Sequence, residues 1–394
     1  MSGPAAIFSP ESTITVALPA TAFANLSSAL QNAGREFSVS LVPVGDCTAL
    51  GPLPPAVQFT GLELLFAIGR ACSRPDVLDD PSRLFALFKY CNVISLADEF
   101  RLKRDVESVD SHKKKVLSDE FGCGMSFIVG SQCFGANFFL DFSTAVQRGW
   151  VATTAPKSRR PDYVTKPSGV SGELTLLEAK GTQTSLQYSQ QDQIPSGCNQ
   201  LESVNLVDSS YSIQKRAVVG IALQGEDEPL ATTCHVGDPV SKPGYTFTFS
   251  DDVDKCIIKS HYARVASLIG DAELAGAITK LRQTTPVQLV ERPTGLRKLS
   301  GTSLTLTSTE GAINIFAGID IDVRQLVIEG ADLGLIQSTI AAVRSSLHDS
   351  KEVSVDGGDG TFLVVSTGMQ GNWSLLETTI SPRPTAIKTP VPKA

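Results

Sequence analysis

Three side chains near the middle of the chain could together support hydrolysis assisted by a divalent cation. Pro161-Asp162 is followed, about one hairpin later, by Glu178-Ala179-Lys180. Glu178 and Lys180 are two positions apart, so on a strand both would leave the same face of the sheet. Converging carboxylates need a cation to relieve their repulsion, and hard oxygen ligands select Mg²⁺ or Mn²⁺. The lysine ammonium could orient a water molecule or stabilise the charge on a phosphate under attack.

The surrounding sequence predicts the elements that would position these groups. Helices are predicted at His112–Phe134 and from Gly197 onward. Four strands are predicted: the segment from Phe138, Arg159–Val164, Gly172–Thr182 and the buried run Lys215–Leu223. The order helix, strand, strand, strand, helix, strand predicts a small α/β core, with Asp162 on the second strand and the Glu178-Lys180 pair on the third.

This arrangement resembles a known nuclease superfamily. RRPDYV followed by LTLLEAKGT is similar to the PD-(D/E)XK phosphodiesterases, which have the restriction-endonuclease-like α/β fold, a mixed sheet flanked by helices. The resemblance covers residues 111–223, under a third of the chain. It implies metal-dependent hydrolysis of a phosphodiester bond in nucleic acid, in DNA rather than RNA, with Mg²⁺ or Mn²⁺ as cofactor. It also implies that Asp162 and Glu178 hold the metal and that Lys180 positions the attacking water.

Two further catalytic residues follow from the same resemblance. The helix before the hairpin often supplies one more acid in such enzymes, and here Glu120 is the first choice as a third metal ligand, with Asp119 as the second. Gln200 lies on the helix after the lysine strand, where several branches of the superfamily keep a polar helper. The resemblance also suggests a setting in bacterial defence against phage, and a homo-oligomer, because many nucleases of this fold cut both strands as dimers.

Basic residues flank the proposed acid on both sides. Lys157, Arg159 and Arg160 precede Asp162, and Lys166 follows it. These cations could bind phosphates beside the scissile bond and so form a nucleic-acid-binding set. They could equally belong to a solvated loop.

Two other interpretations of the site remain open in the sequence. Glu178 and Lys180 could be an exposed pair on an edge strand, with Asp162 capping a turn, in a decayed nuclease-like fold that acts as a structural or interaction protein. Cys123, between two glycines, could be a thiol nucleophile, although among nearby residues only His112 offers a base. Metal binding separates the first interpretation from a live nuclease, and sensitivity to alkylation would mark the second.

Composition limits the class of protein. The chain has 394 residues, with 42% hydrophobic and 19% charged side chains, which is typical of a folded globular protein and excludes disorder. The net charge is −7, whereas a protein dedicated to packaging nucleic acid would be basic. An acidic balance still permits a nucleic-acid enzyme, because local cations and a metal ion can bind phosphates while the remaining surface stays negative.

The spacing of the cysteines and the lengths of the apolar runs indicate in which compartment the protein is located. Eight cysteines occur without a C-x-x-C pair, which argues against a zinc site and favours buried free thiols over disulfides. The sequence near Met1 lacks the basic region of a signal peptide, and no run reaches ~18 apolar residues. We therefore expect no membrane partner and a cytoplasmic location.

The texture of the sequence predicts four regions: residues 1–105, an α+β region of unknown role; 106–230, the nuclease-like domain; 231–380, an α+β domain for recognition or oligomerisation; and 381–394, a disordered tail. Helices are also predicted from Gly61, from Ser82, at Val253–Leu281 and at Leu333–Leu347. A hairpin turn is predicted at Asp356–Thr361.

Overall fold

The computed structural model divides the chain into two compact units. The described residues are 6–73, 89–95, 97–167, 170, 172–208, 210–280, 297–309, 311–347 and 355–368. The larger unit comprises Asn25–Arg74 and Asp80–Arg264, and the smaller unit comprises Met1–Ala24, Pro75–Asp79 and Val265–Ala394. Each unit has its own sheet and its own apolar core.

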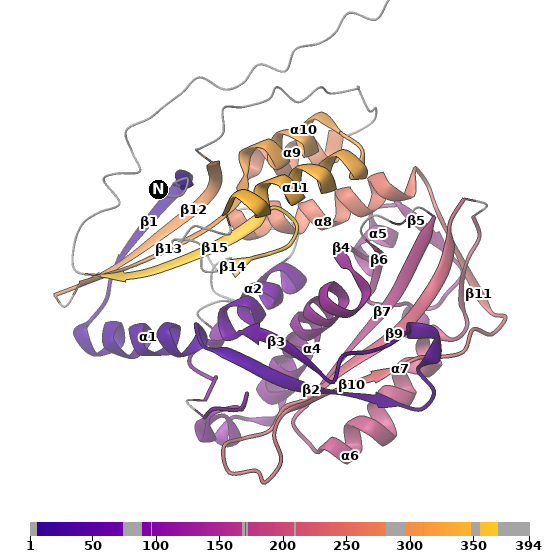
Figure 1. Ribbon diagram of the computed structural model, residues 1–394, viewed down its shortest axis with the longest axis horizontal. Helices are drawn as coiled ribbons and strands as arrows, with labels where there is room; N and C mark the ends of the chain where they lie inside the picture. Colours follow the sequence, from indigo (N-terminus) through magenta and orange to yellow (C-terminus); the bar gives the residue numbers. More distant parts are fainter. Residues whose placement is uncertain are drawn as a thin grey trace, which may run out of the picture. The chain divides into compact units, whose positions relative to one another are not determined.

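A seven-stranded mixed sheet forms the centre of the larger unit (Figure 1). Its order is β3-β2-β10-β9-β7-β6-β4. The strands are β2 (Glu36–Val44), β3 (Ala56–Thr60), β4 (Ala136–Asp141), β6 (Tyr163–Pro167), β7 (Glu173–Thr182), β9 (Ser212–Ala222) and β10 (Thr233–Gly237). Strand β7 runs antiparallel to β6 and parallel to β9. The sheet thus takes strands from three of the predicted regions, 1–105, 106–230 and 231–380.

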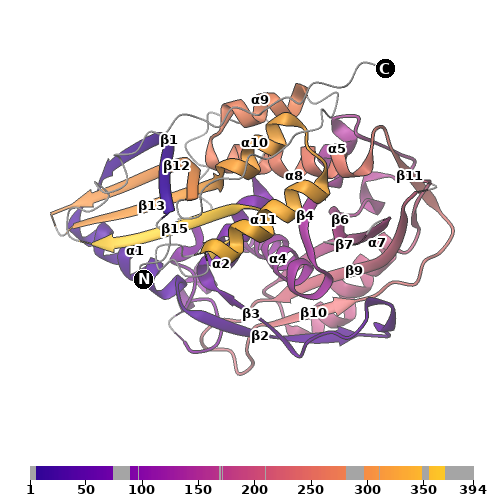
Figure 2. The ribbon, with the colours of Figure 1, turned by 45° about the horizontal axis from the view of Figure 1, so that its top comes forward.

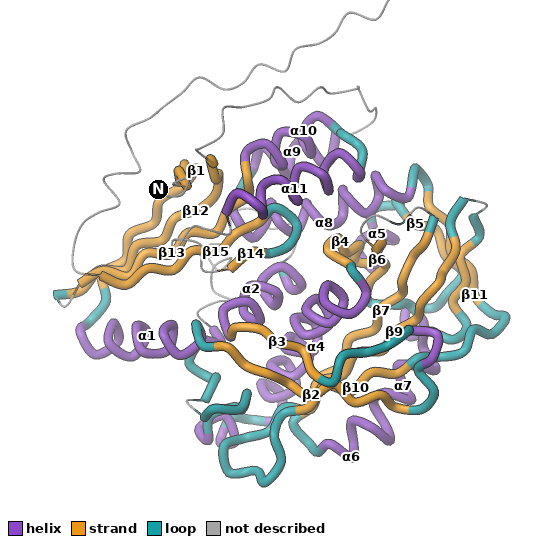
Figure 3. The backbone as a smooth tube through the Cα atoms, viewed as in Figure 1, coloured by secondary structure: helices purple, strands orange, loops and turns teal. Residues whose placement is uncertain are grey.

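Two helices cover opposite faces of the sheet at β7, α4 (Ser111–Phe134) and α7 (Ile194–Leu201). A Cβ at Gly181 would overlap the backbone of α4, whereas one at Gly220, which pairs with Lys180, would lie 2.7 Å from Ile194 of α7. Because neighbouring positions of a strand face opposite sides, the two helices flank β7 (Figures 2 and 3). The mixed α/β class expected from the sequence is therefore confirmed.

Glycines allow α4 to approach the sheet closely. A Cβ at Gly122 would lie only 2.6 Å from the backbone oxygen of Lys180, and Gly181 faces the carbonyl of Ser118 across the same contact. Asp110 caps the start of the helix, because its side chain accepts a hydrogen bond from the Lys113 backbone N–H at 3.1 Å. The small residues that lower the helix propensity of α4 are thus the ones that let its backbone contact β7.

The remaining elements of the larger unit surround this core. They are α1 (Ala20–Ala33, which also reaches into the smaller unit), α2 (Gly61–Cys72), α5 (Phe142–Gln147), α6 (Leu186–Tyr188) and the first part of α8 (Val253–Ile269). A small separate sheet has the order β5-β11-β8 and consists of β5 (Val151–Thr153), β8 (Val204–Leu206) and β11 (Tyr245–Phe249). Helix α2 begins with a capping box, in which Thr60 and Glu63 each bond the other's backbone N–H.

Side chains satisfy the backbone at both outer strands of the seven-stranded sheet. On β3, the amide of Gln132 from α4 donates to the Gln58 carbonyl at 2.6 Å and accepts from its N–H at 3.3 Å. On β4, His261 and Ser260 from α8 accept from backbone N–H groups, at 3.2 Å and 3.0 Å respectively. Backbone groups at sheet edges otherwise offer a template for another strand.

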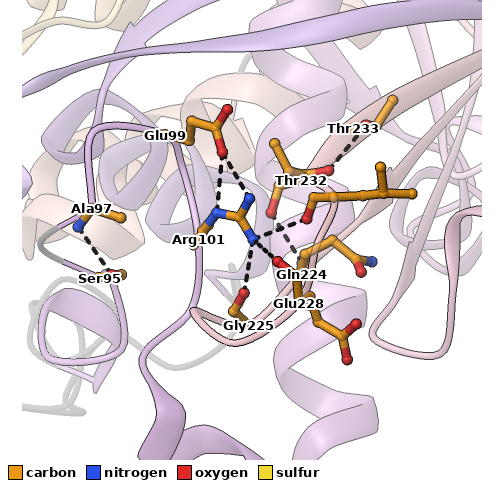
Figure 4. Close-up of polar contacts among 11 residues, drawn as sticks. Ser95, Ala97, Glu99, Arg101, Gln224, Gly225, Glu228, Thr232 and Thr233 are labelled. Carbon is orange, nitrogen blue, oxygen red and sulfur yellow. Dashed lines mark hydrogen bonds and ion pairs between the residues drawn. The ribbon is translucent and has the colours of Figure 1, made fainter.

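Arg101 fixes the loop that joins β9 to β10 (Figure 4). Its Nη1 donates to the carbonyls of Gly225, Glu228 and Leu230 at 3.1, 2.6 and 3.0 Å. Its Nη2 donates to Glu99 at 2.7 Å, which balances the charge. A single guanidinium therefore holds three carbonyls of this loop.

The smaller unit has a five-stranded sheet of order β1-β12-β13-β15-β14. Its elements are β1 (Ala6–Ala17), β12 (Arg297–Ser308), β13 (Gly311–Asp320), β14 (Val355–Asp356), β15 (Thr361–Gly368), α9 (Ala272–Lys280), α10 (Ile321–Glu329) and α11 (Leu333–Leu347). Buried Arg324 of α10 pairs with Asp271 at the start of α9, with Nε to Oδ2 at 2.5 Å. The predicted turn between β14 and β15 is confirmed, and Gly358 and Gly360 both have positive φ there.

Some predicted elements differ from those observed. The strand from Phe138 ends at Asp141, because the Asp141 carboxylate caps α5 by accepting from the Thr144 N–H at 2.5 Å. The second strand begins only at Tyr163, since a short 3₁₀ helix occupies Lys157–Arg159.

Other boundaries shift as well. Helix α7 begins at Ile194 rather than at Gly197, and Val204–Leu206 is a strand. The helix predicted at Val253–Leu281 is two helices, since α8 ends at Ile269 before Gly270, which has φ of 71°. In the segment from Ser82, the helix predicted there does not continue beyond residue 91, because residues 92–95 and 97–100 are not helical. Residues 82–88 and 96 and the tail 381–394 lie outside the described residues.

Candidate functional site

The position of Asp162 follows from where β6 begins. Pairing between β6 and β7 ends at Tyr163 opposite Leu177, so no strand partner remains for the Ala179 N–H on this side of β7. The carboxylate of Asp162, one residue before β6, accepts that N–H at 2.8 Å. The backbone carbonyl of Asp162 in turn accepts from the Phe142 N–H at 3.0 Å. Asp162 is thereby fixed beside the strand that carries Glu178 and Lys180.

Glu178 forms the centre of the site. Its side chain is only 2% exposed. Its Oε1 accepts from Lys180 Nζ at 2.5 Å and its Oε2 accepts from Gln200 Nε2 at 2.8 Å. Burial raises the pKa of Glu178 well above its usual range, and the nearby charge of Asp162 raises it further. The two carboxylates that the sequence predicted to converge therefore do lie together.

Asp162 and Lys180 respond to the same surroundings. Burial raises the pKa of Asp162 above its usual value, although the hydrogen bond from Ala179 works in the opposite direction. Burial also disfavours the charge on Lys180, but the Glu178 and Asp162 carboxylates outweigh that effect, so its pKa is raised overall. Lys180 therefore remains an ammonium group between two carboxylates that are costly to ionise together.

Helix α7 places Gln200 over Glu178. A Cβ at Gly197 would lie 2.5 Å from Val218 and 3.4 Å from the Glu178 side chain, so a glycine is needed for this approach. Gln200 Nε2 also donates to the Arg160 carbonyl, at 2.5 Å. The amide thus links the loop before β6 to the buried carboxylate on β7.

Helix α4 brings Asp119 to the Lys180 side of the site. Glu120 accepts from Lys89 Nζ at 3.0 Å and lies beside the Tyr90 phenol. The exposed carboxylate of Asp119 instead interacts with the Lys180 charge, while partial burial raises its own pKa. Glu120 is thus bound to Lys89, and its predicted role as a third ligand stays a prediction.

The predicted basic set does not act together. Lys157 is exposed in its 3₁₀ turn. Arg159 donates to the Asn199 carbonyl of α7, and Arg160 donates to the Ala155 carbonyl at 3.1 Å. Lys166 is 9% exposed and donates to both Asp254 oxygens at 2.8 Å.

The arginines therefore fasten the loop before β6, and Lys166 belongs to a buried ion pair with Asp254.

A buried ion pair between Arg264 and Asp141 lies close to Asp162. The guanidinium of Arg264, from α8, pairs with the Asp141 carboxylate and lies 5.3 Å from the centre of the Tyr163 ring. The charge of Asp141 contributes to the raised pKa of Asp162. The sequence does not predict this ion pair, because Asp141 and Arg264 are far apart in the chain. One lies at the end of a strand and the other lies in a helix. A charged residue within the apolar pattern of α8 was the only signal.

The other side chains considered as ligands have structural partners. His235, on β10, is fully buried: its Nδ1 lies 2.9 Å from Ser189 Oγ and its Nε2 lies 3.1 Å from the Gln190 amide. His261 accepts from the β4 backbone. All eight cysteines are free thiols, as expected from the sequence, but only Cys91, Cys234 and Cys256 are buried and the other five are partly exposed.

Among the residues that the structure describes, no group of three or more His, Cys, Asp or Glu side chains is placed to hold a metal ion. Comparison with known proteins adds no further constraint. No protein-family model, curated protein or solved structure shows significant similarity to this chain. Within the described ranges, no helix is long and apolar enough to cross a membrane.

Proposed function

We propose that the chain is a metal-dependent endonuclease that hydrolyses phosphodiester bonds of nucleic acid, and of DNA in particular. One observation supports this most strongly: Asp162, Glu178, Lys180 and Gln200 converge from a strand start, a strand and a helix. The elements around them follow the order α4, β4, β6, β7, α7, β9, with short additional elements between them. This order agrees with the PD-(D/E)XK resemblance.

The donor set fits a hard divalent cation. Asp162 and Glu178 supply carboxylate oxygens; burial raises the pKa of each, and the charge of Asp162 raises that of Glu178 further, which a cation would reverse. Mg²⁺ commonly uses only one or two protein carboxylates and fills its other positions with water and substrate phosphate. A bound cation would polarise the phosphate and make a coordinated water more acidic.

The protein side chains would divide the remaining tasks. The Lys180 ammonium, whose side chain is 23% exposed, would orient the attacking water and balance charge on the phosphate. Gln200 would keep Glu178 in place through its bond to Oε2. Asp119, exposed at the Lys180 side, would accept a proton or add charge to the site, in the role first predicted for Glu120.

The test is cleavage of plasmid DNA and labelled RNA with Mg²⁺ or Mn²⁺, with EDTA as the blank. Asp162→Asn and Glu178→Gln should reduce cleavage by at least about a hundredfold, while Lys180→Met should reduce it and still bind Mn²⁺. Glu120→Gln is the matched control, an acid on the same helix whose side chain is paired with Lys89. Normal cleavage by either carboxylate variant would refute the assignment.

One observation favours a decayed site instead. Both oxygens of Glu178 already have protein partners and the side chain is almost inaccessible. In a decayed fold these bonds would be purely structural, as expected for a structural or interaction protein. Calorimetry with Mn²⁺ separates the two: binding that is lost in Asp162→Asn supports the nuclease, and an absence of binding supports the interaction protein.

A further inference from the structure

We propose that Tyr188 is a stacking platform for an unpaired base, so that the substrate of the candidate site is single-stranded nucleic acid. This inference rests on the proposed function, because it names the substrate class of the same site. Tyr188 is the last residue of α6 and is 41% exposed. An aromatic ring that the fold leaves uncovered can stack on any base, because every base has a π-face.

The turn that follows Tyr188 lies beside the candidate site. Lys180 on β7 pairs with Gly220 on β9, and neighbouring strands are about 4.8 Å apart. A Cβ at Gly220 would lie 3.5 Å from Ser189 Oγ, on the face of the sheet that α7 covers. The Lys180 side chain leaves the same face, because residues paired in register point to the same side. Tyr188 is therefore one residue away from a contact with the strand pair that carries the site.

Buried contacts hold Tyr188 in this place. Ser189 is fully buried, and its Oγ lies 2.9 Å from His235 Nδ1. Gln193 Nε2 donates to the Gly181 carbonyl of β7 at 3.0 Å. The π turn that begins at Ser189 and ends at Gln193 lies between these two contacts, and such turns are frequent at functional sites. A platform that is fixed in advance loses little conformational entropy when a base binds.

Exposed amide groups accompany the aromatic ring. Gln187 and Gln191 are exposed near Tyr188, and Gln187 Nε2 donates to Gln191 Oε1 at 3.1 Å. An amide both donates and accepts hydrogen bonds, which suits the edges of bases that have no pairing partner. Among the exposed residues of 183–201, Asp192 alone is charged. The segment thus offers amides and an aromatic ring, and no cations.

The small number of free cations favours a single strand over a duplex. Duplex binding relies mainly on lysine and arginine contacts to phosphates. The sequence has no lysine or arginine in 181–214, and Arg159, Arg160 and Lys166 bond to protein groups. Stacking on an aromatic side chain gives affinity without a cation. A duplex keeps its bases stacked and paired, so its bases cannot reach Tyr188.

Binding in EDTA, where cleavage is prevented, tests the inference. Fluorescence anisotropy of labelled oligonucleotides is measured with the full chain and with single-stranded DNA, single-stranded RNA of the same sequence, the DNA duplex and an abasic strand. We expect both single strands to bind more tightly than the duplex. Tyr188→Ala should weaken single-strand binding by about five- to a hundredfold, whereas Tyr188→Phe should retain it. Tyr245→Ala, which removes an exposed tyrosine on β11, should leave binding unchanged.

The abasic strand separates stacking from contacts to phosphate. It keeps the phosphates and lacks the bases, so the native chain and Tyr188→Ala should bind it equally. The proposal is overturned by equal binding of duplex and single strand, by an equal Tyr188→Ala defect on the abasic strand, or by no binding of any oligonucleotide. Loss of self-association in Tyr188→Ala with unchanged oligonucleotide binding would also overturn it and would assign the ring to a protein contact.

Cleavage then separates this inference from the proposed function. Circular single-stranded DNA and the duplex plasmid of the same sequence are compared with Mg²⁺ or Mn²⁺. Faster cleavage of the single strand that is lost in Tyr188→Ala supports the inference. Equal cleavage of both forms that is lost in Asp162→Asn keeps the nuclease and refutes the inference. Binding of single strands through Tyr188 without any cleavage refutes the nuclease and leaves the binding result standing.

Discussion

Lowering the pH from 7 to 5 is expected to destabilise the chain through His235. This side chain is completely buried on β10 and its pKa is lowered to about 4 by burial. A neutral ring satisfies both of its contacts, since it can donate from Nδ1 to Ser189 and accept at Nε2 from Gln190. Both partners belong to the turn that leads into α7, so the neutral form supports the helix that carries Gln200.

The magnitude follows from linkage. An unfolded histidine has a pKa of about 6.5, so below that pH the unfolded chain binds a proton that the folded chain excludes. With a folded pKa of about 4, the expected loss of unfolding free energy between pH 7 and pH 5 is about 2 kcal/mol. The loss begins near pH 6.5 and levels off below about pH 4, where the folded ring is also protonated.

The measurement is urea unfolding at both pH values, followed by tryptophan fluorescence. His235→Asn keeps a donor near Ser189 but cannot titrate, so it should lose about 2 kcal/mol less than the native chain. His112→Asn, at an exposed position, should behave like the native chain. Equal losses in the native and His235→Asn proteins would refute the argument, because the difference between pH values is independent of any overall cost of the substitution.

Three further substitutions probe the packing and the sheet edges. Gly181→Ala should lower the unfolding free energy in urea by about 3 kcal/mol, because the new methyl group overlaps the α4 backbone, whereas Gly276→Ala in α9 has open space and should change it by about 1 kcal/mol or less. Gln132→Ala should speed amide exchange in β3, and unchanged exchange would show that its edge contact is unimportant. Arg101→Ala should make the loop after β9 sensitive to protease, an effect that leucine at this position should not rescue if the three carbonyl bonds matter.

The long periodic segments were predictable from the sequence. The helices at α2, α4 and α11 and the strands β7 and β9 lie within a few residues of the predicted ranges, because their apolar patterns extend over many positions. The convergence of Glu178 and Lys180 also followed from strand alternation alone. Asp162 reaches the same site although it precedes its strand, through a bond to a backbone N–H.

Long-range pairings were not predictable. Strand β10 pairs with β2, from a distant part of the chain, so the sheet is wider than the segment that carries the motif. Neighbouring residues such as Asp119 and Glu120 point about 100° apart around a helix axis. The apolar residues of α4 are too irregularly spaced to predict which of the two side chains faces β7. The ion pair of Lys166 with Asp254 likewise depends on where α8 packs.

The capped outer strands of the seven-stranded sheet restrict how copies of this chain could assemble. At β3 and β4, side chains of α4 and α8 occupy the outward backbone groups, so these margins offer a neighbouring molecule few free amides to match. A dimer, if it forms, would have to be built from helices and loops and not by continuing this sheet from one subunit into the next. The same helix that brings Asp119 to Lys180 thus also keeps the sheet from growing, so a change in α4 would alter solubility as well as the site.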